Sequence, residues 1–307
     1  MRFFVTGASG WIGSAVVPEL IDAGHQVVGL ARSDASAEAL TEAGAEVVRG
    51  TVDDLDVLRD AAVASDGVIH LAFKHDIAFT GDFQGAAQAD RRAVDAFGEA
   101  LAGTGRPFVL ASGVAGLAPG RVATERSTPV IDGSPVSMRQ ATAQKVLDLA
   151  SRGVRSSVVR LSPTCHGEGD QGFMATLVDI ARAKGVSGYI GDGANRWPAV
   201  HRLDAARLFR LAAEQAPAGT VLHGVAEEGV AIRDVAEVIG RHLDVPMVSV
   251  APDRAAEHFT WLGAFLGLDS PASNTLTREQ LGWEPTRPGL LEDLGKGHYF
   301  HIADTVA

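Results

Sequence analysis

The sequence has little cysteine, no concentration of basic charge and no long apolar run. Cys165 is the single cysteine among 307 residues, which excludes an internal disulfide and indicates a reducing compartment. The formal net charge is -11 and no basic block offsets it, which argues against nucleic acid and anionic membranes as partners. The first expected strand begins at Arg2, leaving no room for a signal peptide, and no apolar run reaches membrane length. Together these absences predict a soluble, cytoplasmic protein.

Short apolar runs alternate with amphipathic segments through the first half of the chain. The expected strands, each rich in aliphatic residues, cover 2–7, 26–32, 45–50, 67–73, 107–112 and 156–163. The helices expected between them cover 11–23, 36–44, 54–64, 86–103 and 136–152. This alternation is typical of an α/β protein with a doubly wound, parallel Rossmann sheet. Pro18 lies inside the first helix, where we expect it to kink the axis or remove a hydrogen bond.

The rhythm breaks after Pro163. Helices are expected near 172–184 and 204–215 within irregular, glycine-bearing segments, and the apolar stretch 221–227 suggests one more strand of the main sheet. We therefore predict a nucleotide-binding domain over 1–163 and a smaller substrate-side portion over 164–307, partly interleaved with the first.

A glycine-rich turn joins the first strand to the first helix. The stretch VTGASGWIG places Gly7, Gly10 and Gly13 where a tight turn, a close backbone approach to a pyrophosphate and close helix–strand packing need them. The following helix N-terminus attracts negative charge. Because the pattern sits inside a complete βαβ unit, it predicts a dinucleotide site rather than a merely tight turn.

The end of the second strand indicates which dinucleotide is preferred. An acid there would bind the ribose 2′-hydroxyl of NAD, whereas an arginine accommodates the 2′-phosphate of NADP. The stretch GLARSD has Ala31 at the acid position, followed by Arg32 and Ser33, while Asp34 is expected to cap the next helix. We predict NADP(H), the alternative being that Arg32 is simply a solvated residue.

Three motifs carry a resemblance to a known family. The spacing T-G-x-x-G-x-x-G, the stretch RGTVDD and the HLA that closes the fourth strand resemble the short-chain dehydrogenase/reductase superfamily. Length and C-terminal portion resemble its extended, epimerase/dehydratase-like branch, closely over the first 165 residues and loosely beyond. The resemblance implies that the cofactor is held by Thr6, Gly7, Ser9, Gly10, Trp11, Ile12, Gly13, Arg32, Ser33, Thr51, Val52, Leu71, Ala72, Phe73, Ser112, Arg139, Leu161 and Pro163.

The catalytic tyrosine of that family is missing here. The family uses a serine, then a tyrosine with a lysine four residues later that lowers the tyrosine pKa. Ser112 stands at or next to the serine position, but Pro135 and Arg139 stand where the tyrosine and lysine would be, which resembles the atypical members. Arg139 can stabilise a developing alkoxide but cannot donate a proton. We expect the proton to come from His166 or from water, with a structural role for His166 as the alternative.

Further residues are candidates for the substrate side. His75, Trp197 and His201 are expected to contact the substrate, although His75 and the adjacent Asp76 do not by themselves establish a dyad. Cys165 has no evident activating partner and is not expected to act as a nucleophile. No spacing of histidines or carboxylates is typical of a metal site, so no metal is expected.

These observations favour one function over two others. The leading hypothesis is an NADPH-dependent oxidoreductase that reduces a carbonyl or imine-like group of a small, mostly apolar molecule, with Ser112, Arg139 and His166 as catalytic residues. The alternatives are an epimerase or dehydratase that retains its cofactor, and a non-enzymatic NADP(H)-binding sensor. A homodimer formed through the helices expected over 84–102 and 136–152 is compatible with the sequence.

Overall fold

The fold is built on one parallel sheet of seven strands. The structure is a computed structural model that describes residues 1–78 and 81–301, except for the side chains of 135 and 136. The strand order is β10-β6-β5-β4-β1-β2-β3, and every neighbouring pair is parallel, which confirms the predicted doubly wound Rossmann sheet. The strands are β1 (Arg2–Thr6), β2 (Gln26–Ala31), β3 (Glu46–Arg49), β4 (Gly67–His70), β5 (Pro107–Gly113), β6 (Arg155–Leu161) and β10 (Thr220–Gly224).

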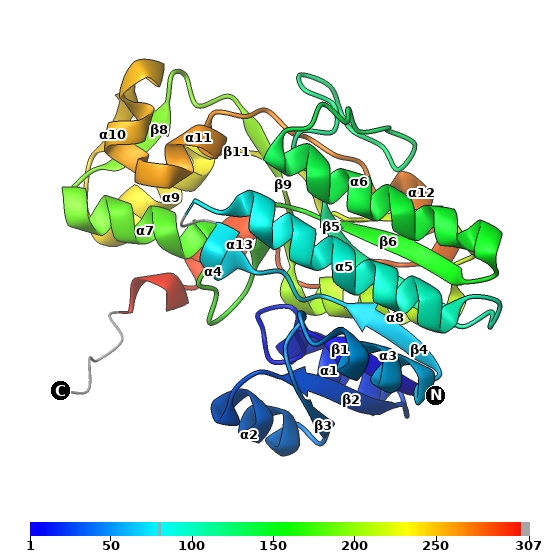
Figure 1. Cartoon of the computed structure of the whole chain (residues 1–307). Helices are drawn as coiled ribbons and strands as arrows, with labels where there is room; N and C mark the ends of the chain where they lie inside the picture. The colour runs from blue at the N-terminus through cyan, green and yellow to red at the C-terminus, as the bar shows by residue number, and fades with distance from the viewer. Residues whose placement is uncertain (79–80, 302–307) are drawn as a thin grey trace.

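Helices cover both faces of this sheet, and two apolar clusters fill the space between. Phe4, Phe97 and Phe108 belong to one cluster, and Phe209 and Trp283 to the other; all five side chains are fully buried. Figure 1 shows α5 and α6 running side by side across one face, and the two helices contact each other along their length. The helices around this sheet are α1 (Gly13–Asp22), α2 (Asp34–Glu42), α3 (Leu55–Val63), α5 (Phe83–Leu101), α6 (Pro135–Asp148), η1 (Leu149–Arg152), α8 (Arg202–Gln215) and α12 (Thr275–Leu281).

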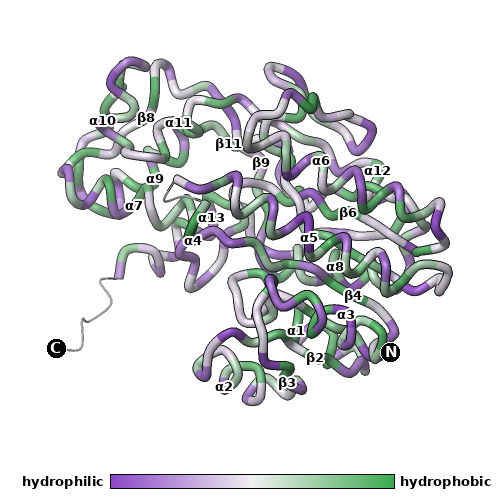
Figure 2. The backbone as a smooth tube through the Cα atoms, in the orientation of Figure 1, coloured by the Kyte–Doolittle hydropathy of each residue, from purple (hydrophilic) through white to green (hydrophobic). Residues whose placement is uncertain are grey.

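The patterning of these helices explains their packing. The long helix α5 alternates hydrophobic and hydrophilic residues along its length (Figure 2), and its buried positions include Ala93, Phe97 and Leu101 on one face. Helix α1 contains Pro18 without interruption. Because proline has no N–H, Pro18 leaves the Ser14 carbonyl without a partner in the helix. Both residues are exposed, so water can bond to that carbonyl. None of the described helices is long and apolar enough to cross a bilayer.

The C-terminal half adds one strand to the main sheet and also forms two small sheets of its own. Strand β10 pairs with β6, as the stretch 221–227 suggested, and α8 packs against α1. The remaining strands form two small sheets, β11-β9-β7 and β12-β8. Their elements are β7 (Thr164–His166), α7 (Phe173–Lys184), β8 (Ser187–Ile190), β9 (Arg196–His201), β11 (Glu227–Ala231), α9 (Ile232–Leu243), β12 (Met247–Val250), η2 (Pro252–Arg254), α10 (Ala255–Phe259), η3 (Thr260–Leu262), α11 (Gly263–Leu266), α13 (Leu290–Gly295) and η4 (His298–Phe300).

Candidate active site

A cleft with three connected compartments lies at the carboxyl ends of the central strands. We call them the charged compartment (about 600 Å³, around Arg32, Thr51 and Lys74), the loop compartment (about 720 Å³, around Ser9, Trp11 and Arg202) and the apolar cavity (about 300 Å³, around Ser112, Arg139 and Trp197). His75, from the short helix α4 (His75–Ala78), lines all three. The position is the one expected for a ligand in a doubly wound sheet, where the strand order reverses.

The glycine loop between β1 and α1 fits a dinucleotide. Gly7 has φ +66°, and a side chain there would lie 2.8 Å from the Ala72 backbone nitrogen. A side chain at Gly13 would lie 2.1 Å from the Gly7 carbonyl oxygen, so the first turn of α1 packs directly on the loop. Gly10 lines both the charged and the loop compartments. The glycines therefore give the loop the tight packing that the dinucleotide motif needs, beside a helix N-terminus that favours a phosphate.

Trp11 and Arg202 tie this loop to the C-terminal half of the chain. The Trp11 indole nitrogen donates to the Cys165 carbonyl at 2.8 Å, and the Arg202 guanidinium lies 4.4 Å from the indole ring. Arg202 thereby adds a cation to the compartment that the phosphate loop lines. The sequence prediction missed Arg202, because no local pattern brings residue 202 to residue 11.

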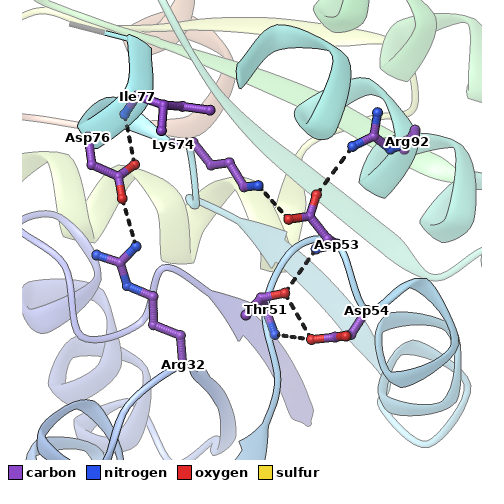
Figure 3. A network of polar contacts seen from close by, with 8 residues as sticks. All are labelled: Arg32, Thr51, Asp53, Asp54, Lys74, Asp76, Ile77 and Arg92. Atoms are coloured by element: carbon purple, nitrogen blue, oxygen red, sulfur yellow. Dashed lines mark hydrogen bonds and ion pairs between the residues drawn. The ribbon is translucent and has the colours of Figure 1, made fainter. Parts of the chain in front are cut away.

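The charged compartment holds a polar network across its opening. Arg32 Nη1 lies 3.1 Å from the Asp76 carboxylate, and Lys74 and Arg92 both pair with Asp53, the latter at 3.2 Å (Figure 3). Thr51 donates to Asp54 through its backbone nitrogen at 2.7 Å and its hydroxyl at 2.8 Å. Lys74 and Asp53 were not predicted as site residues, and Asp76 was weighed only for the substrate side.

The start of α2 differs from the prediction. Ser33, not Asp34, is the residue that caps α2, accepting a hydrogen bond from the Ser36 nitrogen at 3.2 Å. Asp34 is the first residue of the helix, where its carboxylate pairs with Arg49. The extended backbone of Ser33 places its hydroxyl over the first turn, which Asp34 cannot do from inside the helix. Ser36 lines the charged compartment, a position that the sequence prediction did not include.

The apolar cavity contains few polar groups. Its large apolar walls are Phe83, Phe173, Trp197, Phe265 and Leu268. Trp197 is held by a hydrogen bond from its indole nitrogen to the Leu268 carbonyl at 3.0 Å. The polar side chains that reach the cavity, besides His75, are Ser112, Arg139, Gln140, Ser162 and Ser270.

Arg139 is the cation of this cavity. Its Nη2 donates to the Ala111 carbonyl at 3.3 Å, and its guanidinium lies 4.2 Å from the Phe73 ring. Its Nε is buried and has no hydrogen-bond partner among the described residues. Burial lowers the pKa of the guanidinium and the nearby Asp90 carboxylate opposes that shift. An arginine nevertheless stays charged in the working range, so the cavity holds a cation with unused donor capacity.

Two further polar side chains meet in the cavity beside Arg139. Ser112 is buried near the end of β5. Burial and, secondarily, the Arg139 charge lower the pKa of His75 to about 4, so its imidazole is neutral near neutral pH. The cavity can therefore present a hydroxyl, a neutral imidazole and a guanidinium to one small ligand.

His166 and His201 lie in a buried cluster rather than in the compartments described above. The His166 side chain is fully buried, with Nδ1 2.9 Å from the Asp293 carboxylate, and its ring packs edge-on against His201 at 5.3 Å. His201 accepts from the Leu203 nitrogen at 3.2 Å and so caps α8. Neither is among the described residues that line the three compartments. The burial of His166 and its contact with Asp293 favour a structural role for this residue, which was the alternative to proton donation.

Most of the predicted cofactor residues meet in the cleft. Thr6 lies beneath it, with its hydroxyl 2.5 Å from His70 Nδ1 and accepting from the Ala72 nitrogen at 3.3 Å. Thr6, Gly13 and Ser33 are not among the described lining residues. Those that line the compartments are Gly7, Ser9, Gly10, Trp11, Ile12, Arg32, Thr51, Val52, Leu71, Ala72, Phe73, Ser112, Arg139, Leu161 and Pro163.

Residues 3–223 match the model of the NAD dependent epimerase/dehydratase family. The chain belongs to this family. An uncharacterized protein of Schizosaccharomyces pombe is 48% identical over 98% of this chain and 100% of its own length, and one of Saccharomyces cerevisiae is 45% identical over 96% and 98%. A 4-hydroxy-2-methyl-3-oxo-4-farnesyl-3,4-dihydroquinoline-1-oxide ketoreductase of Stigmatella aurantiaca is 28% identical over 84% and 79%.

Solved structures of the same fold include enzymes of this family type. UDP-glucose 4-epimerase of Thermotoga maritima superposes with a TM-score of 0.76 at 21% identity, covering 98% of each chain. The dTDP-glucose 4,6-dehydratase of Streptomyces venezuelae, solved with NAD bound, superposes with a TM-score of 0.76 at 22% identity, covering 97% of this chain and 96% of its own. At these identities the likeness shows the fold. The family and its neighbours are oxidoreductase- and epimerase-type enzymes.

This member of the epimerase/dehydratase family has no tyrosine among the described residues that line the cleft. Helix α6 begins at Pro135, where the tyrosine was expected by alignment. Tyr299 donates to Asp170 at 3.0 Å, and burial raises its pKa. Tyr189 lies on β8, in the two-stranded sheet β12-β8. Burial likewise raises the pKa of Cys165, which disfavours a thiolate there, and no three-ligand metal cluster occurs among the described residues.

Proposed function

We propose that the chain is an NADPH-dependent reductase of a carbonyl or imine-like group in a small, uncharged, mostly apolar molecule. The observation that carries this proposal is the apolar cavity, because Arg139 is its one permanently charged side chain among the described lining residues. Aromatic walls favour an apolar ligand, and a single cation with unused donor capacity favours one oxygen that becomes negative during reaction.

The chain's own residues supply binding and charge stabilisation. NADPH, when bound, supplies the hydride that reduces the substrate carbon. Arg139 and the Ser112 hydroxyl then donate hydrogen bonds to the substrate oxygen as its charge grows, while the neutral His75 can orient it. With His166 enclosed, we assign delivery of the proton to water that enters from the loop compartment, since that compartment adjoins the cavity at His75 and Pro163.

The charged compartment supports NADPH over NADH. Strand β2 ends at Ala31, so no carboxylate stands at its tip to accept the ribose 2′-hydroxyl, and Arg32 and Lys74 line the compartment together with their ion-pair partners Asp76 and Asp53. Two cations next to a ribose favour a 2′-phosphate, with which arginine can make two charge-assisted hydrogen bonds.

The cavity fits a nucleotide sugar poorly. A nucleoside diphosphate group needs several cations, but Arg139 stands alone in the described lining of the cavity. Arg196, at the start of β9, is engaged by Asp269 through two side-chain contacts of 3.1 and 3.0 Å. The ketoreductase of Stigmatella aurantiaca, by contrast, carries an oxo group and a farnesyl chain in the name of its substrate, which supports reduction of a ketone on an apolar molecule.

The proposal is tested by turnover. Purified protein is incubated with NADPH or NADH and a panel of apolar ketones, aldehydes and imines, with UDP-glucose in parallel, and cofactor absorbance and products are followed. We expect net NADPH oxidation with apolar carbonyls and none with UDP-glucose. Conversion of UDP-glucose without net redox change would instead identify an epimerase. Tight NADPH binding without turnover on any substrate would favour the sensor.

A further inference from the structure

The charged compartment carries no excess positive charge as it stands. Its described charged lining residues are the cations Arg32 and Lys74 and the carboxylates Asp53 and Asp76. Each cation already contacts a carboxylate: Arg32 pairs with Asp76 and Lys74 with Asp53 (Figure 3). A phosphate monoester carries about −1.5 to −2 charges near neutral pH. It would therefore enter a site whose cations are both occupied.

The two ion pairs differ in how easily they can be exchanged. Asp53 is held by two cations, Lys74 and Arg92. Asp76 contacts one nitrogen of Arg32 at 3.1 Å and also accepts from the Ile77 backbone nitrogen at 3.1 Å, and the Asp76 and Arg32 side chains are 55% and 69% exposed. An exposed, single-contact pair contributes little free energy, and a phosphate offers arginine a stronger, two-pronged partner. Arg32 is thus the cation that a phosphate can take over at least cost.

The position of Asp76 opposes a phosphate directly. It follows His75 on α4 and lines the same compartment as Arg32, Ser36 and Lys74. Unless its carboxylate turns away, it repels an anion held by Arg32. The effect is confined to ligands that carry a phosphate at this end of the cleft, because a ribose 2′-hydroxyl brings no charge.

We propose that Asp76 is a specificity-determining residue that occupies Arg32 in the free protein and is displaced by the 2′-phosphate of the cofactor. Asp76 thereby reduces the preference for NADPH that Arg32 and Lys74 create. The inference rests on the NADPH preference proposed above, and it assigns to Asp76 a task at the adenosine end of the cofactor rather than at the substrate.

The test is the binding of adenosine nucleotides to Asp76→Asn. Isothermal titration compares 2′,5′-ADP with 5′-AMP, and NADPH with NADH, on the wild-type chain and the variant. Losing the competing carboxylate should tighten 2′,5′-ADP and NADPH by about fivefold, the upper range for an exposed ion pair, and leave 5′-AMP and NADH unchanged. The gain should shrink at high salt. Unchanged or weaker binding of 2′,5′-ADP to the variant would overturn the proposal.

A double-mutant cycle shows whether the effect acts through Arg32. In an Arg32→Ala background, Asp76→Asn should no longer tighten 2′,5′-ADP, and a gain that persists there would contradict the displacement of Asp76 from Arg32. Asp179→Asn is the matched control, since Asp179 also pairs with an arginine, Arg182, but lies on α7. It removes the same charge and should leave all four affinities unchanged; an equal gain in this control would also refute the proposal.

The outcomes separate this inference from the proposed function. A fivefold gain for 2′,5′-ADP in Asp76→Asn supports the role of Asp76 even if no carbonyl substrate is turned over. Turnover of apolar ketones with NADPH, together with identical affinities in the wild type and Asp76→Asn, supports the reductase and refutes the role of Asp76.

Discussion

The two ends of the cleft differ in how they can bind a ligand. In the charged compartment Arg32, Lys74, Asp53 and Asp76 form ion pairs open to solvent, so each contact contributes little and is screened by salt. In the apolar cavity aromatic side chains and Arg139 line the same space, and the Arg139 Nε is buried without a described partner. A charge in that environment interacts far more strongly with a developing anion. In the proposed reductase, charge balance therefore sets the choice of cofactor, and the Arg139 cation sets the chemistry.

Replacing Arg139 should have the largest effect of the substitutions, and the effect should be on turnover rather than on cofactor binding. We expect Arg139→Met to lower kcat/KM by about 10²- to 10³-fold, because a donor aimed at the developing oxyanion is lost, while the Kd for NADPH changes much less. Steady-state kinetics and titration of NADPH measure the two quantities.

A matched arginine separates this role from folding. Arg155 is also partly buried, but it is the first residue of β6, at the end of the strand opposite the cleft, and it donates to the Ala213 and Ala216 carbonyls. Arg155→Met should keep wild-type kinetics per folded molecule. Wild-type turnover in Arg139→Met, or a parallel loss of NADPH affinity, would contradict the claim that Arg139 acts on the substrate and not on the cofactor.

The free energy of unfolding should fall at acid pH in part because of His75, which lines all three compartments of the cleft. Its folded pKa of about 4 lies below the ordinary 6.5, so the unfolded chain binds the proton first as the pH falls. This contribution to the free energy of unfolding is intact above pH 6.5 and declines as the pH falls toward the folded pKa. His75→Gln should lose correspondingly less stability on acidification.

Urea unfolding at neutral pH and near pH 5 measures the difference. His223, whose pKa burial also lowers to about 4, is present in both proteins and gives each the same background slope. Equal losses of stability in the wild type and His75→Gln would show that His75 is not held neutral in the cleft.

Trimming one wall of the apolar cavity should have the smallest effect. Phe265, on α11, lines the cavity, and Phe265→Ala should raise KM for an apolar carbonyl by about fivefold, close to the value of one buried methylene group. The Kd for NADPH should stay constant. Val63→Ala, at an exposed position of α3, serves as the control. A loss of NADPH affinity in Phe265→Ala would mean that the cavity and the cofactor site are not separate.

The features that the sequence predicted well are local. The β1–loop–α1 unit needs only neighbouring residues, because Gly7 and Gly13 are required where the chain approaches itself within a few residues or packs on the end of β4. The continuous apolar runs of the strands likewise indicate burial on both faces, which is why the parallel sheet could be predicted. The same pattern predicted that β10 belongs to the main sheet. Arg139 and Ser112 were placed by the resemblance to the short-chain dehydrogenase/reductase superfamily, at the positions of its lysine and serine.

The features that escaped prediction are pairings between distant residues. His166 looked available as an acid until the fold placed Asp293 beside it, 127 residues further along the chain. Arg202 reaches Trp11, and Asp76 reaches Arg32, through packing that no local pattern encodes. The cap of α2 was misassigned by one residue, since Ser33 and Asp34 are both good capping residues and only the backbone conformation decides between them.

The central claim is that the cleft transfers a hydride from NADPH to an apolar carbonyl beside Arg139. The most direct measurement is a single-turnover reaction with NADPH deuterated at C4 of the nicotinamide and an apolar ketone, followed by mass spectrometry of the product. We predict deuterium on the carbinol carbon of the product alcohol in the wild type and, within the time of one wild-type turnover, almost none in Arg139→Met at the same cofactor occupancy. An alcohol formed without deuterium from either face of the nicotinamide, or equal transfer in both proteins, would contradict the account.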